Sequence, residues 1–388
     1  MANALRVLLI SGEYPPMQGG VSDFTHLVGQ DLAALGCEVH VLTSTRAAQR
    51  SGSPVVCHPV VPSWGWRPLY GALRALLAEL GPHVINIQYQ TAAYGLHPAI
   101  NALPALVRSA PSVVTYHDLL TPYLFPKAGP ARWWANLALA RASRAVIVTN
   151  REDELQLQKY RWIRLLKRIP IGSNVPCVPP DDYNRNAWRA SHNIPKDALL
   201  MCYFGFLNAS KGGEELIAAL EHLCHEGYDA RLLMIGGQVG ASDPTNRAYL
   251  QVVQRSIHAK GLEERVIWTG YMPPPEVSAA FLSADVCVLP YRDGASFRRG
   301  SFMAALAHGM PIVTTEPRVD LPELAHEENV FLVPPRAPHA LAQGVMRLAN
   351  DAALRRRLGE GARQLSQAFD WRRIAERTLE VYHAVIAR

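Results

Sequence analysis

The sequence lacks the features that mark membrane proteins, disulfide-rich secreted proteins and metal-binding proteins. No apolar run approaches the about 20 residues that a transmembrane helix needs. The N-terminal segment MANALRVLLISGEYPP has one arginine and only a short apolar run, so we do not interpret it as a signal peptide. The six cysteines are scattered and form no C-x-x-C pair, which argues against a disulfide framework or a metal site and favours a reducing cytosol.

Charged residues are also few. They make up 19% of the 388 residues against 49% for hydrophobic residues, a globular composition in a chain long enough for two domains. The net charge of +6 is uneven, because sixteen Lys and Arg against nine Asp and Glu give residues 1–175 a charge of +7, while 23 against 24 give the remainder −1. This asymmetry predicts an anionic partner, which could be a membrane surface, an acidic acceptor or a nucleic acid.

A basic stretch, KYRWIRLLKRIP, supplies much of this charge. The candidates for holding an anionic acceptor or membrane surface are Lys159, Arg161, Arg164, Lys167 and Arg168. The stretch has no signature of a nucleic-acid-binding fold, so we expect no nucleic acid as partner. Upstream, we assign one ring of the Trp133-Trp134 pair to the core, and the other stays open between the core and a membrane-facing helix. The oligomeric state is left open.

Short apolar strands alternate with helical stretches along the chain, which is the pattern of a doubly wound α/β sheet. The predicted strands are residues 5–10, 38–42, 83–87, 112–116 and 145–148, then 199–205, 231–235, 266–268, 285–289 and 312–315. A proline-rich segment at 170–180 separates the two series, and a last helix at 371–386 has an apolar stripe that needs a partner in the first series. We therefore predict one domain of residues 1–178 plus 372–388 and a second of residues 179–371.

The polar loop after the predicted strand at 285–289 is the clearest candidate site. Its residues are Asp293, Ser296, Arg298 and Arg299, followed by Gly300 and Ser301 at the start of a helix. A cationic loop at the carboxyl end of a strand, leading into a helix N-terminus, suits a phosphorylated ligand. The alternative is an ordinary loop with a solvated arginine pair.

Other strands of the second series also end in glycine loops. Lys211 precedes Gly212-Gly213 at a helix start, where an ammonium beside free N–H groups is a candidate diphosphate clamp, although a solvated lysine is the commoner case. Further candidates at strand ends are Gly205, Gly237 and Tyr271.

The first series offers two candidate regions. Gly19-Gly20 lies at a helix start and allows a ligand to approach the backbone, with a plain turn as the alternative. The same loop lacks G-x-G-x-x-G, so we expect no nicotinamide cofactor. His117 directly follows a strand, and Gln88 and Tyr89 end the preceding strand, so these three could line one crevice.

Four segments together resemble the motifs of glycosyltransferase family 4, the retaining transferases that use nucleotide sugars. They are EYPPMQGGVSDFTHLVGQDLAALGCEVHVLT, VVTYHD, YFGFLNASKG and FMAALAHGMPIVTT. In this order they are similar to the family's first loop and helix, its sugar-side histidine motif, its G-R-L-x-x-x-K-G phosphate motif and its E-A-M-A-x-G-x-P-V-V helix and strand. The resemblance covers essentially the whole chain. It implies the GT-B fold, in which two Rossmann-like doubly wound domains face a central cleft.

The resemblance also implies a reaction. A hexosyl group would pass from a nucleotide diphosphate sugar, UDP-sugar before GDP-sugar, to a hydroxyl of an acceptor glycan, lipid or small molecule, with retention of configuration. The location implied is cytoplasmic, with the inner face of the membrane as one option, and no cofactor or metal is expected because the loops have no Asp-x-Asp pair. The implied catalytic residues are His117, Lys211 and Asp293. The implied donor-binding residues are Gly19, Gly20, Gly205, Lys211, Gly237, Tyr271, Asp293, Ser296, Arg298, Arg299, Gly300 and Ser301.

The chain departs from the family pattern at three positions. Phe206 occupies the place of the usual phosphate-binding arginine, and the family's two glutamates fall on Ser296 and Ala304. Arg298 and Arg299 could supply the missing positive charge, and Asp293 could reach the sugar hydroxyls. Two alternatives follow from these departures: a non-catalytic sugar-nucleotide-binding subunit, and a nucleotide-sugar epimerase on the same fold, which would need acid–base carboxylates.

Overall fold

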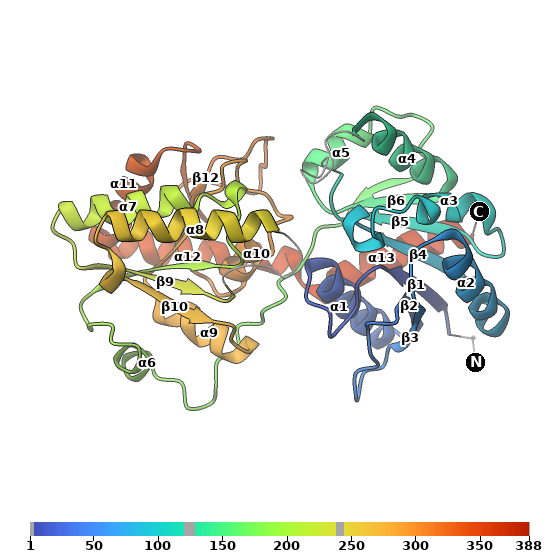
Figure 1. The fold of residues 1–388 in the computed structure, drawn as a ribbon, viewed down its shortest axis with the longest axis horizontal. Helices are drawn as coiled ribbons and strands as arrows, with labels where there is room; N and C mark the ends of the chain where they lie inside the picture. The colour runs from blue at the N-terminus through green and yellow to red at the C-terminus, as the bar shows by residue number, and fades with distance from the viewer. Residues whose placement is uncertain (1–3, 120–128, 238–243, 388) are drawn as a thin grey trace. The chain divides into compact units, whose positions relative to one another are not determined.

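The computed structural model describes residues 4–119, 129–237 and 244–387. It divides into two compact units, of which the first comprises Met1–Gly172 with Phe369–Arg388 and the second comprises Ser173–Ala368 (Figure 1). The boundaries predicted from the sequence, after residues 178 and 371, lie slightly further along the chain than these crossings. Each unit is built on its own parallel sheet with helices on both faces.

The sheet of the first unit has seven parallel strands in the order β3-β2-β1-β4-β5-β6-β7. They are β1 (Arg6–Ser11), β2 (Glu38–Ser44), β3 (Val56–Val61), β4 (Val84–Tyr89), β5 (Ser112–Tyr116), β6 (Ala145–Val148) and β7 (Leu166–Arg168). Central strands such as β4 are buried along their whole length, as parallel strands between two helix layers are. The sequence pattern does not predict the edge strands β3 and β7, because β3 is partly exposed and contains Pro59 and β7 has only three residues.

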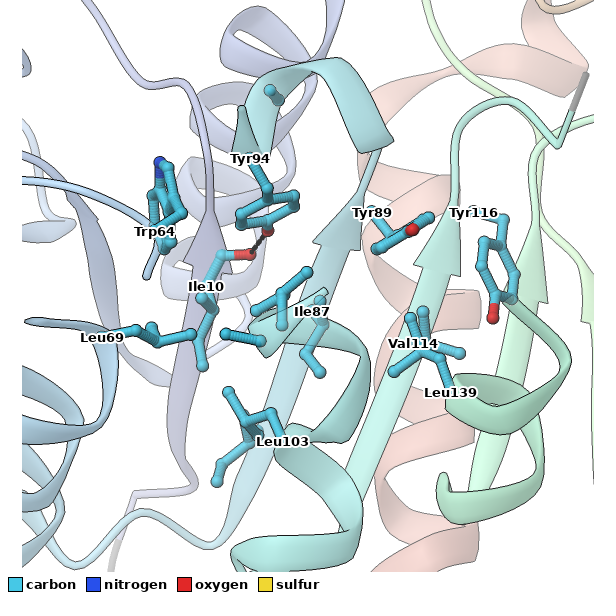
Figure 2. Close-up of a cluster of buried hydrophobic side chains, with 14 of the residues drawn as sticks. Ile10, Trp64, Leu69, Ile87, Tyr89, Tyr94, Leu103, Val114, Tyr116 and Leu139 are labelled. Carbon is cyan, nitrogen blue, oxygen red and sulfur yellow. Dashed lines mark hydrogen bonds between the residues drawn. The ribbon is translucent and has the colours of Figure 1, made fainter. Parts of the chain in front are cut away.

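Helices cover both faces of this sheet. One face carries α2 (Trp66–Leu80), α3 (Ala99–Leu106) and α4 (Gly129–Ala142), the other carries α1 (Gly20–Ala34) and α13 (Trp371–Ile386), and α5 (Arg151–Leu157) and η1 (Thr91–Tyr94) complete the unit. Side chains of β1 alternate between the two cores, Leu8 and Ile10 toward the first and Val7 and Leu9 toward the second. Figure 2 shows the first core, in which the buried Tyr94 hydroxyl donates a hydrogen bond to the Ile10 carbonyl over 2.9 Å.

The C-terminal helix α13 belongs to the first unit. Its residues Ile374, Tyr382 and Val385 are buried against α1 and the sheet, where the apolar stripe predicts a partner. Asn86 of β4 donates a hydrogen bond to the Tyr382 hydroxyl over 2.7 Å, so the helix is joined to the centre of the sheet by a polar contact as well. Ile386, the last residue of the predicted stripe, is 40% exposed.

The sheet of the second unit has six parallel strands in the order β10-β9-β8-β11-β12-β13. They are β8 (Leu199–Phe204), β9 (Ala230–Ile235), β10 (Val266–Gly270), β11 (Val286–Leu289), β12 (Ile312–Thr315) and β13 (Phe331–Val333). The helices are α6 (Arg185–Ser191), α7 (Gly213–His225), α8 (Pro244–Ala259), α9 (Pro274–Ser283), α10 (Gly300–Ala307), α11 (Pro338–Asn350) and α12 (Ala352–Ser366), with the shorter η3 (Ala209–Lys211), η4 (Glu263–Arg265) and η5 (Gln367–Phe369).

Each sheet reverses its strand order at one point. In the first unit the reversal lies between β1 and β4, and in the second it lies between β8 and β11. Open parallel sheets bind ligands in the crevice that such a reversal opens beyond the carboxyl ends of the strands. None of the helices in the ranges that the structure describes is long and apolar enough to cross a bilayer.

Candidate functional site

Two glycines bring the loops after β8 and β11 together at the reversal point of the second sheet. Gly212 has φ +70°, and a side chain there would place its Cβ 2.0 Å from the carbonyl oxygen of Pro290, which directly follows β11. Gly205, at the end of β8, has φ +106°, and a Cβ there would lie 3.2 Å from Nζ of Lys211. Both positions require glycine, and together they place the start of α7 against the end of β11.

Lys211 lies in this junction as a cation without a carboxylate partner among the described residues. It ends η3, whose first turn is capped by Asn208, and its side chain is half-buried. Burial, with a smaller contribution from the charge of Arg299, lowers the pKa of Lys211 from 10.5 to about 7. This environment disfavours the charged form of Lys211 when no anion is bound. An anion next to Nζ would stabilise the ammonium, so binding of an anion there would be strongly favoured. The interpretation of Lys211 as a solvated surface lysine does not fit this burial.

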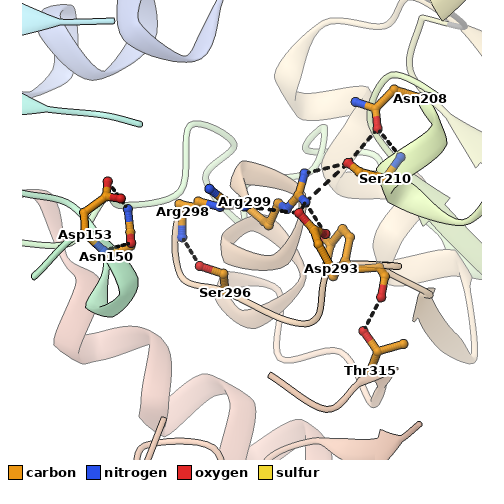
Figure 3. Close-up of polar contacts among 10 residues, drawn as sticks. Asn150, Asp153, Asn208, Ser210, Asp293, Ser296, Arg298, Arg299 and Thr315 are labelled. Atoms are coloured by element: carbon orange, nitrogen blue, oxygen red, sulfur yellow. Dashed lines mark hydrogen bonds and ion pairs between the residues drawn. The ribbon is translucent and has the colours of Figure 1, made fainter. Parts of the chain in front are cut away.

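The loop after β11 presents two guanidinium groups to a single carboxylate (Figure 3). Nη2 of Arg299 lies 2.5 Å from Oδ1 of Asp293 and also donates to Oδ2, and Nη2 of Arg298 lies 3.1 Å from Oδ2. The arginine side chains are only 14% and 11% exposed, so the alternative of a solvated pair is wrong. Asp293 therefore holds both guanidinium groups in this loop.

The other polar residues of this loop stabilise its shape. The Tyr291 hydroxyl and Ser301 Oγ are hydrogen-bonded over 2.7 Å, and Thr315 Oγ1 donates to the Tyr291 carbonyl over 2.7 Å. Ser296 Oγ accepts from the Arg298 N–H over 3.5 Å. The Ser301 hydroxyl, predicted to bind the donor, is thus already engaged within the loop, whereas Ser296 only accepts one long contact there.

Arg292 belongs to the same loop but is electrostatically satisfied. Its guanidinium lies 2.7 Å from Glu214 and 2.7 Å from Glu215 at the start of α7, and it lies over the Tyr249 ring at 5.8 Å. Its backbone N–H donates to the Ser210 carbonyl over 2.8 Å. Arg292 therefore connects the two loops. The sequence analysis did not predict this role, although the two consecutive glutamates after Gly213 could have indicated a partner for a nearby arginine.

The remaining candidates of the second unit lie at the ends of β9 and β10 and at the start of α10. A Cβ at Gly237 would lie 3.0 Å from the Phe206 ring, so the aromatic side chain covers the end of β9. Tyr271 follows β10 and is 77% exposed. Gly300 opens α10, and Ala304 in the same helix is fully buried, so the second glutamate position of the family pattern holds a core residue here.

In the first unit, His117 and Gln88 form one pair at the ends of β5 and β4. Nε2 of His117 lies 3.0 Å from Oε1 of Gln88, and the Phe24 ring packs edge-on against the imidazole at 4.6 Å. Burial lowers the pKa of His117 to about 3, so the ring is neutral at physiological pH. Because the Gln88 amide presents its oxygen to the ring, the imidazole donates from Nε2. Nδ1 of the neutral ring is then an acceptor.

Tyr89 does not line the crevice that the sequence predicts for it together with His117 and Gln88, so this prediction is wrong. Its side chain is 1% exposed and lies in the core shown in Figure 2. Its hydroxyl accepts from Asn101 Nδ2 over 3.0 Å and from Thr91 Oγ1 over 3.2 Å. Successive residues of a strand point to opposite faces, so Gln88 and Tyr89 could not both face a ligand at the same surface.

Gly19 and Gly20 open α1, and a carboxylate already lies beside them. A Cβ at Gly19 would come within 2.4 Å of Oε2 of Glu13. Burial raises the pKa of Glu13, and the charge of Arg46 opposes this shift. Asp23 adds a second acid in the first turn of α1, so this helix N-terminus is less suited to a phosphate than the sequence predicts. Glu13 is the residue that sequence reasoning missed here, although it precedes the glycines in the same loop.

The predicted basic face is present in the first unit, mostly in exposed positions. Lys159, Arg161, Arg164 and Lys167 are exposed, whereas Arg168 is half-buried and pairs with Glu154 at 3.3 Å. A cavity of about 320 Å³ opens in this region, lined by Glu154, Leu157, Gln158, Tyr160, Arg161, Ile163 and Leu166. Of the tryptophan pair in α4, Trp133 packs against the core and donates to the Tyr160 hydroxyl, while Trp134 is 69% exposed.

Two family models match the chain, one in each unit. The model of the glycosyl transferase 4-like domain matches residues 19–166, and the model of glycosyl transferases group 1 matches residues 184–365. The chain belongs to the family 4 type of glycosyltransferases. The two matched regions and the four segments that resemble family 4 motifs therefore indicate the same family.

Curated relatives of this chain are distant. A D-inositol 3-phosphate glycosyltransferase of Corynebacterium glutamicum is 27% identical over 62% of the chain and 58% of its own length, and one from Xylanimonas cellulosilytica is 31% identical over 62% and 57%. The chain thus spans under two thirds of the length of these two relatives. A GDP-mannose-dependent alpha-(1-6)-phosphatidylinositol monomannoside mannosyltransferase of Mycobacterium tuberculosis is 24% identical over 95% of the chain and 94% of the relative.

Solved structures show the same fold over nearly the whole chain. The sucrose-phosphate synthase of Thermosynechococcus elongatus has a TM-score of 0.77 at 23% identity and covers 99% of each chain. Anabaena HepE, solved in complex with UDP and glucose, has a TM-score of 0.77 at 17% identity and covers 98% of this chain and 100% of its own. Two Rossmann-like α/β units and these neighbours define the fold as GT-B.

Proposed function

We propose that this chain is a retaining glycosyltransferase, which transfers a hexosyl group from a nucleotide diphosphate sugar to an acceptor hydroxyl. The supporting observation is the cluster of Lys211, Arg298 and Arg299 at the reversal point of the second sheet, where Lys211 has no carboxylate partner among the described residues. Membership of the family and the match to the group 1 model over residues 184–365 support the same assignment.

The chemical task is to stabilise the leaving diphosphate. In the proposed step the bond between the anomeric carbon and the donor phosphate oxygen breaks, and the acceptor oxygen bonds to that carbon on the same face. The acceptor proton goes to an oxygen of the departing diphosphate, as the family's front-face mechanism implies. Fixed cations in a half-buried site, together with the N–H groups at the start of α7, would stabilise the charge that develops on the leaving group.

Donor and acceptor classes are proposed from the relatives. The mannosyltransferase relative is named for GDP-mannose, and Anabaena HepE is known in complex with UDP, so UDP- and GDP-sugars are the two donor candidates. Other relatives are named for D-inositol 3-phosphate and for a phosphatidylinositol mannoside, so an anionic small molecule or lipid is the first acceptor to test. Lys159, Arg161, Arg164 and Lys167 would hold such an acceptor, or an anionic membrane surface at the cytoplasmic side, by charge complementarity.

A donor and acceptor panel tests this proposal. The full chain is incubated with UDP-glucose, UDP-galactose, GDP-mannose and related donors, with inositol phosphates and phosphatidylinositol lipids as acceptors, while released UDP or GDP is quantified. We expect acceptor-dependent release with one donor and a product with the donor's anomeric configuration. Nucleotide release with an inverted product would refute retention, and no release or binding with any donor would refute the transferase assignment.

A non-catalytic sugar-nucleotide-binding subunit is the second candidate. It is favoured by the loss of both family glutamates, because neither Ser296 nor the buried Ala304 carries a carboxylate. Nucleotide-sugar binding without release of nucleoside diphosphate would identify this alternative. The epimerase alternative has less support, because Asp293, the acid that the loop offers, is held by two guanidinium groups.

Transfer without a metal ion is part of the proposal. The described residues contain no group of three His, Cys, Asp or Glu side chains placed to hold a metal ion. Turnover should persist when EDTA is present and should not rise when Mg²⁺ or Mn²⁺ is added. Loss of activity in EDTA that is restored by Mn²⁺ would contradict this part.

A further inference from the structure

Arg298 and Arg299 share one carboxylate but have different neighbours. Besides Asp293, Arg299 contacts Ser210 Oγ through Nη1 and Nη2, both at 3.4 Å, and its Cζ lies over the Tyr291 ring at 5.0 Å (Figure 3). Ser210 directly precedes Lys211, and Arg299 is the charged group that contributes to the lowered pKa of that lysine. Arg299 therefore lies beside Lys211, and the two cations belong to one site.

This pair of cations is an unfavourable arrangement that a doubly charged ligand relieves. Like charges placed side by side repel each other, and the charge of Arg299 contributes to the lowered pKa of Lys211. The single negative charge of Asp293 offsets the charge of one guanidinium group. Nε of Arg299 is buried and has no hydrogen-bond acceptor among the described residues. A diphosphate offers two phosphoryl groups, one for an ammonium and one for a planar guanidinium that matches phosphate geometry.

We propose that Arg299 is the guanidinium that binds the diphosphate of the donor beside Lys211, and that Asp293 is a positioning residue that holds Arg299 at this place. The inference rests on the proposed function and deepens it, because it selects one arginine of the pair. It also assigns Asp293 to the arginine, whereas the sequence predicts contact with sugar hydroxyls. The contacts of Arg299 support this assignment. Both carboxylate oxygens of Asp293 contact the guanidinium, and Ser210 joins the guanidinium to the loop that carries Lys211.

Calorimetric titration of the full chain with UDP, UMP, GDP and GMP tests the assignment of Arg299. Loss of a hydrogen bond between charged groups should reduce the affinity of Arg299→Ala for the nucleoside diphosphate by about tenfold to hundredfold, with a smaller loss for the monophosphate. Arg298→Ala should lose less than Arg299→Ala. The matched control is Arg265→Ala, which removes a guanidinium paired with Asp229 at 2.7 Å next to the amino end of β10 and should bind the diphosphate like the wild type.

Asp293→Asn separates a positioning role from a sugar contact. If Asp293 acts through Arg299, this variant weakens binding of UDP and UDP-glucose, or of GDP and GDP-mannose, by the same factor. Weakening of the nucleotide sugar alone would show that Asp293 contacts the sugar and would overturn the positioning role. A binding stoichiometry near that of the wild type verifies that each variant is folded.

The outcomes also separate this inference from the proposed function. A wild-type chain that binds neither nucleoside diphosphate contradicts the proposed function itself. A wild-type chain that binds one of them, with Arg299→Ala binding equally well, contradicts only the assignment of Arg299. Arg299→Lys keeps the charge but loses the planar fork, so its affinity should lie between those of the wild type and Arg299→Ala.

Discussion

Replacing Lys211 by methionine should remove most turnover and at the same time stabilise the fold. Methionine keeps an unbranched side chain of similar length but carries no charge. The ammonium is disfavoured in the folded chain by burial and by Arg299, yet the same ammonium is the group that a leaving diphosphate needs. Activity and stability should therefore change in opposite directions, which a purely structural lysine would not produce.

The expected magnitudes follow from the environment of Lys211. A pKa lowered from 10.5 to about 7 corresponds to on the order of 5 kcal/mol as an upper bound on the destabilisation that the methionine variant removes. Loss of one preorganised donor to a developing anion costs about 2.7–4 kcal/mol of transition-state stabilisation, or about 10²- to 10³-fold in kcat. The kinetic loss and the gain in unfolding free energy are thus both large enough to measure.

The stability difference has a defined pH dependence. Between about pH 7 and pH 10.5 the unfolded chain binds a proton on Lys211 that the folded chain does not bind, so wild-type stability rises with pH over this interval relative to the variant. The advantage of Lys211→Met is complete below about pH 7 and disappears as the pH approaches 10.5. Urea unfolding of both proteins from about pH 6 to pH 10 measures this difference.

Lys260→Met is the matched control, because Lys260 pairs with Glu221 at 2.5 Å in the same unit. This variant should show no gain in stability and no loss of turnover. A Lys211→Met variant that is less stable than the wild type at pH 7, or that keeps full turnover, would refute the reasoning about the buried ammonium.

Three further predictions concern other parts of the chain. The imidazole resonances of His117 should not titrate between about pH 5 and pH 8 in NMR spectra, because burial lowers its pKa to about 3; a midpoint near 6.5 would contradict the buried pairing. Tyr382→Phe should lower the free energy of unfolding by about 1–3 kcal/mol without changing nucleotide affinity, because Asn86 loses its buried acceptor; unchanged stability in urea unfolding would contradict this contact. Gly212→Ala should weaken both folding and nucleoside diphosphate binding, because the added Cβ would meet the Pro290 carbonyl at 2.0 Å, and near-wild-type values in both assays would argue against the close approach of the two loops.

The strands and helices around the site could be predicted because their local sequence agrees with the fold. The run before Pro290, the start of α10 at Gly300 and its end before Gly309, which has φ +60°, are each marked by residue type. The edge strand β13 was missed because three residues give too short a pattern to recognise. Edge strands are specified by pairing with a neighbour that is remote in sequence, and residue type alone carries little of that information.

The site itself could be predicted only as a set of candidates. Lys211, Arg298 and Arg299 were found because they lie at strand ends or helix starts. Their environments could not be predicted, since the pairing of both guanidinium groups with Asp293 depends on side-chain directions across a folded loop. The prediction for Tyr89 was wrong for a related reason: its place at a strand end says little about which face its side chain takes.

The most direct test of the proposed diphosphate site is a crystal structure of the full chain with UDP or GDP bound, whichever binds more tightly in solution. We expect the diphosphate to lie beyond the carboxyl ends of β8 and β11, with oxygens in hydrogen-bond contact with Lys211 Nζ and the Arg299 guanidinium. A nucleotide whose diphosphate lies elsewhere in the chain, with Lys211 and Arg299 unchanged and out of contact, would contradict it.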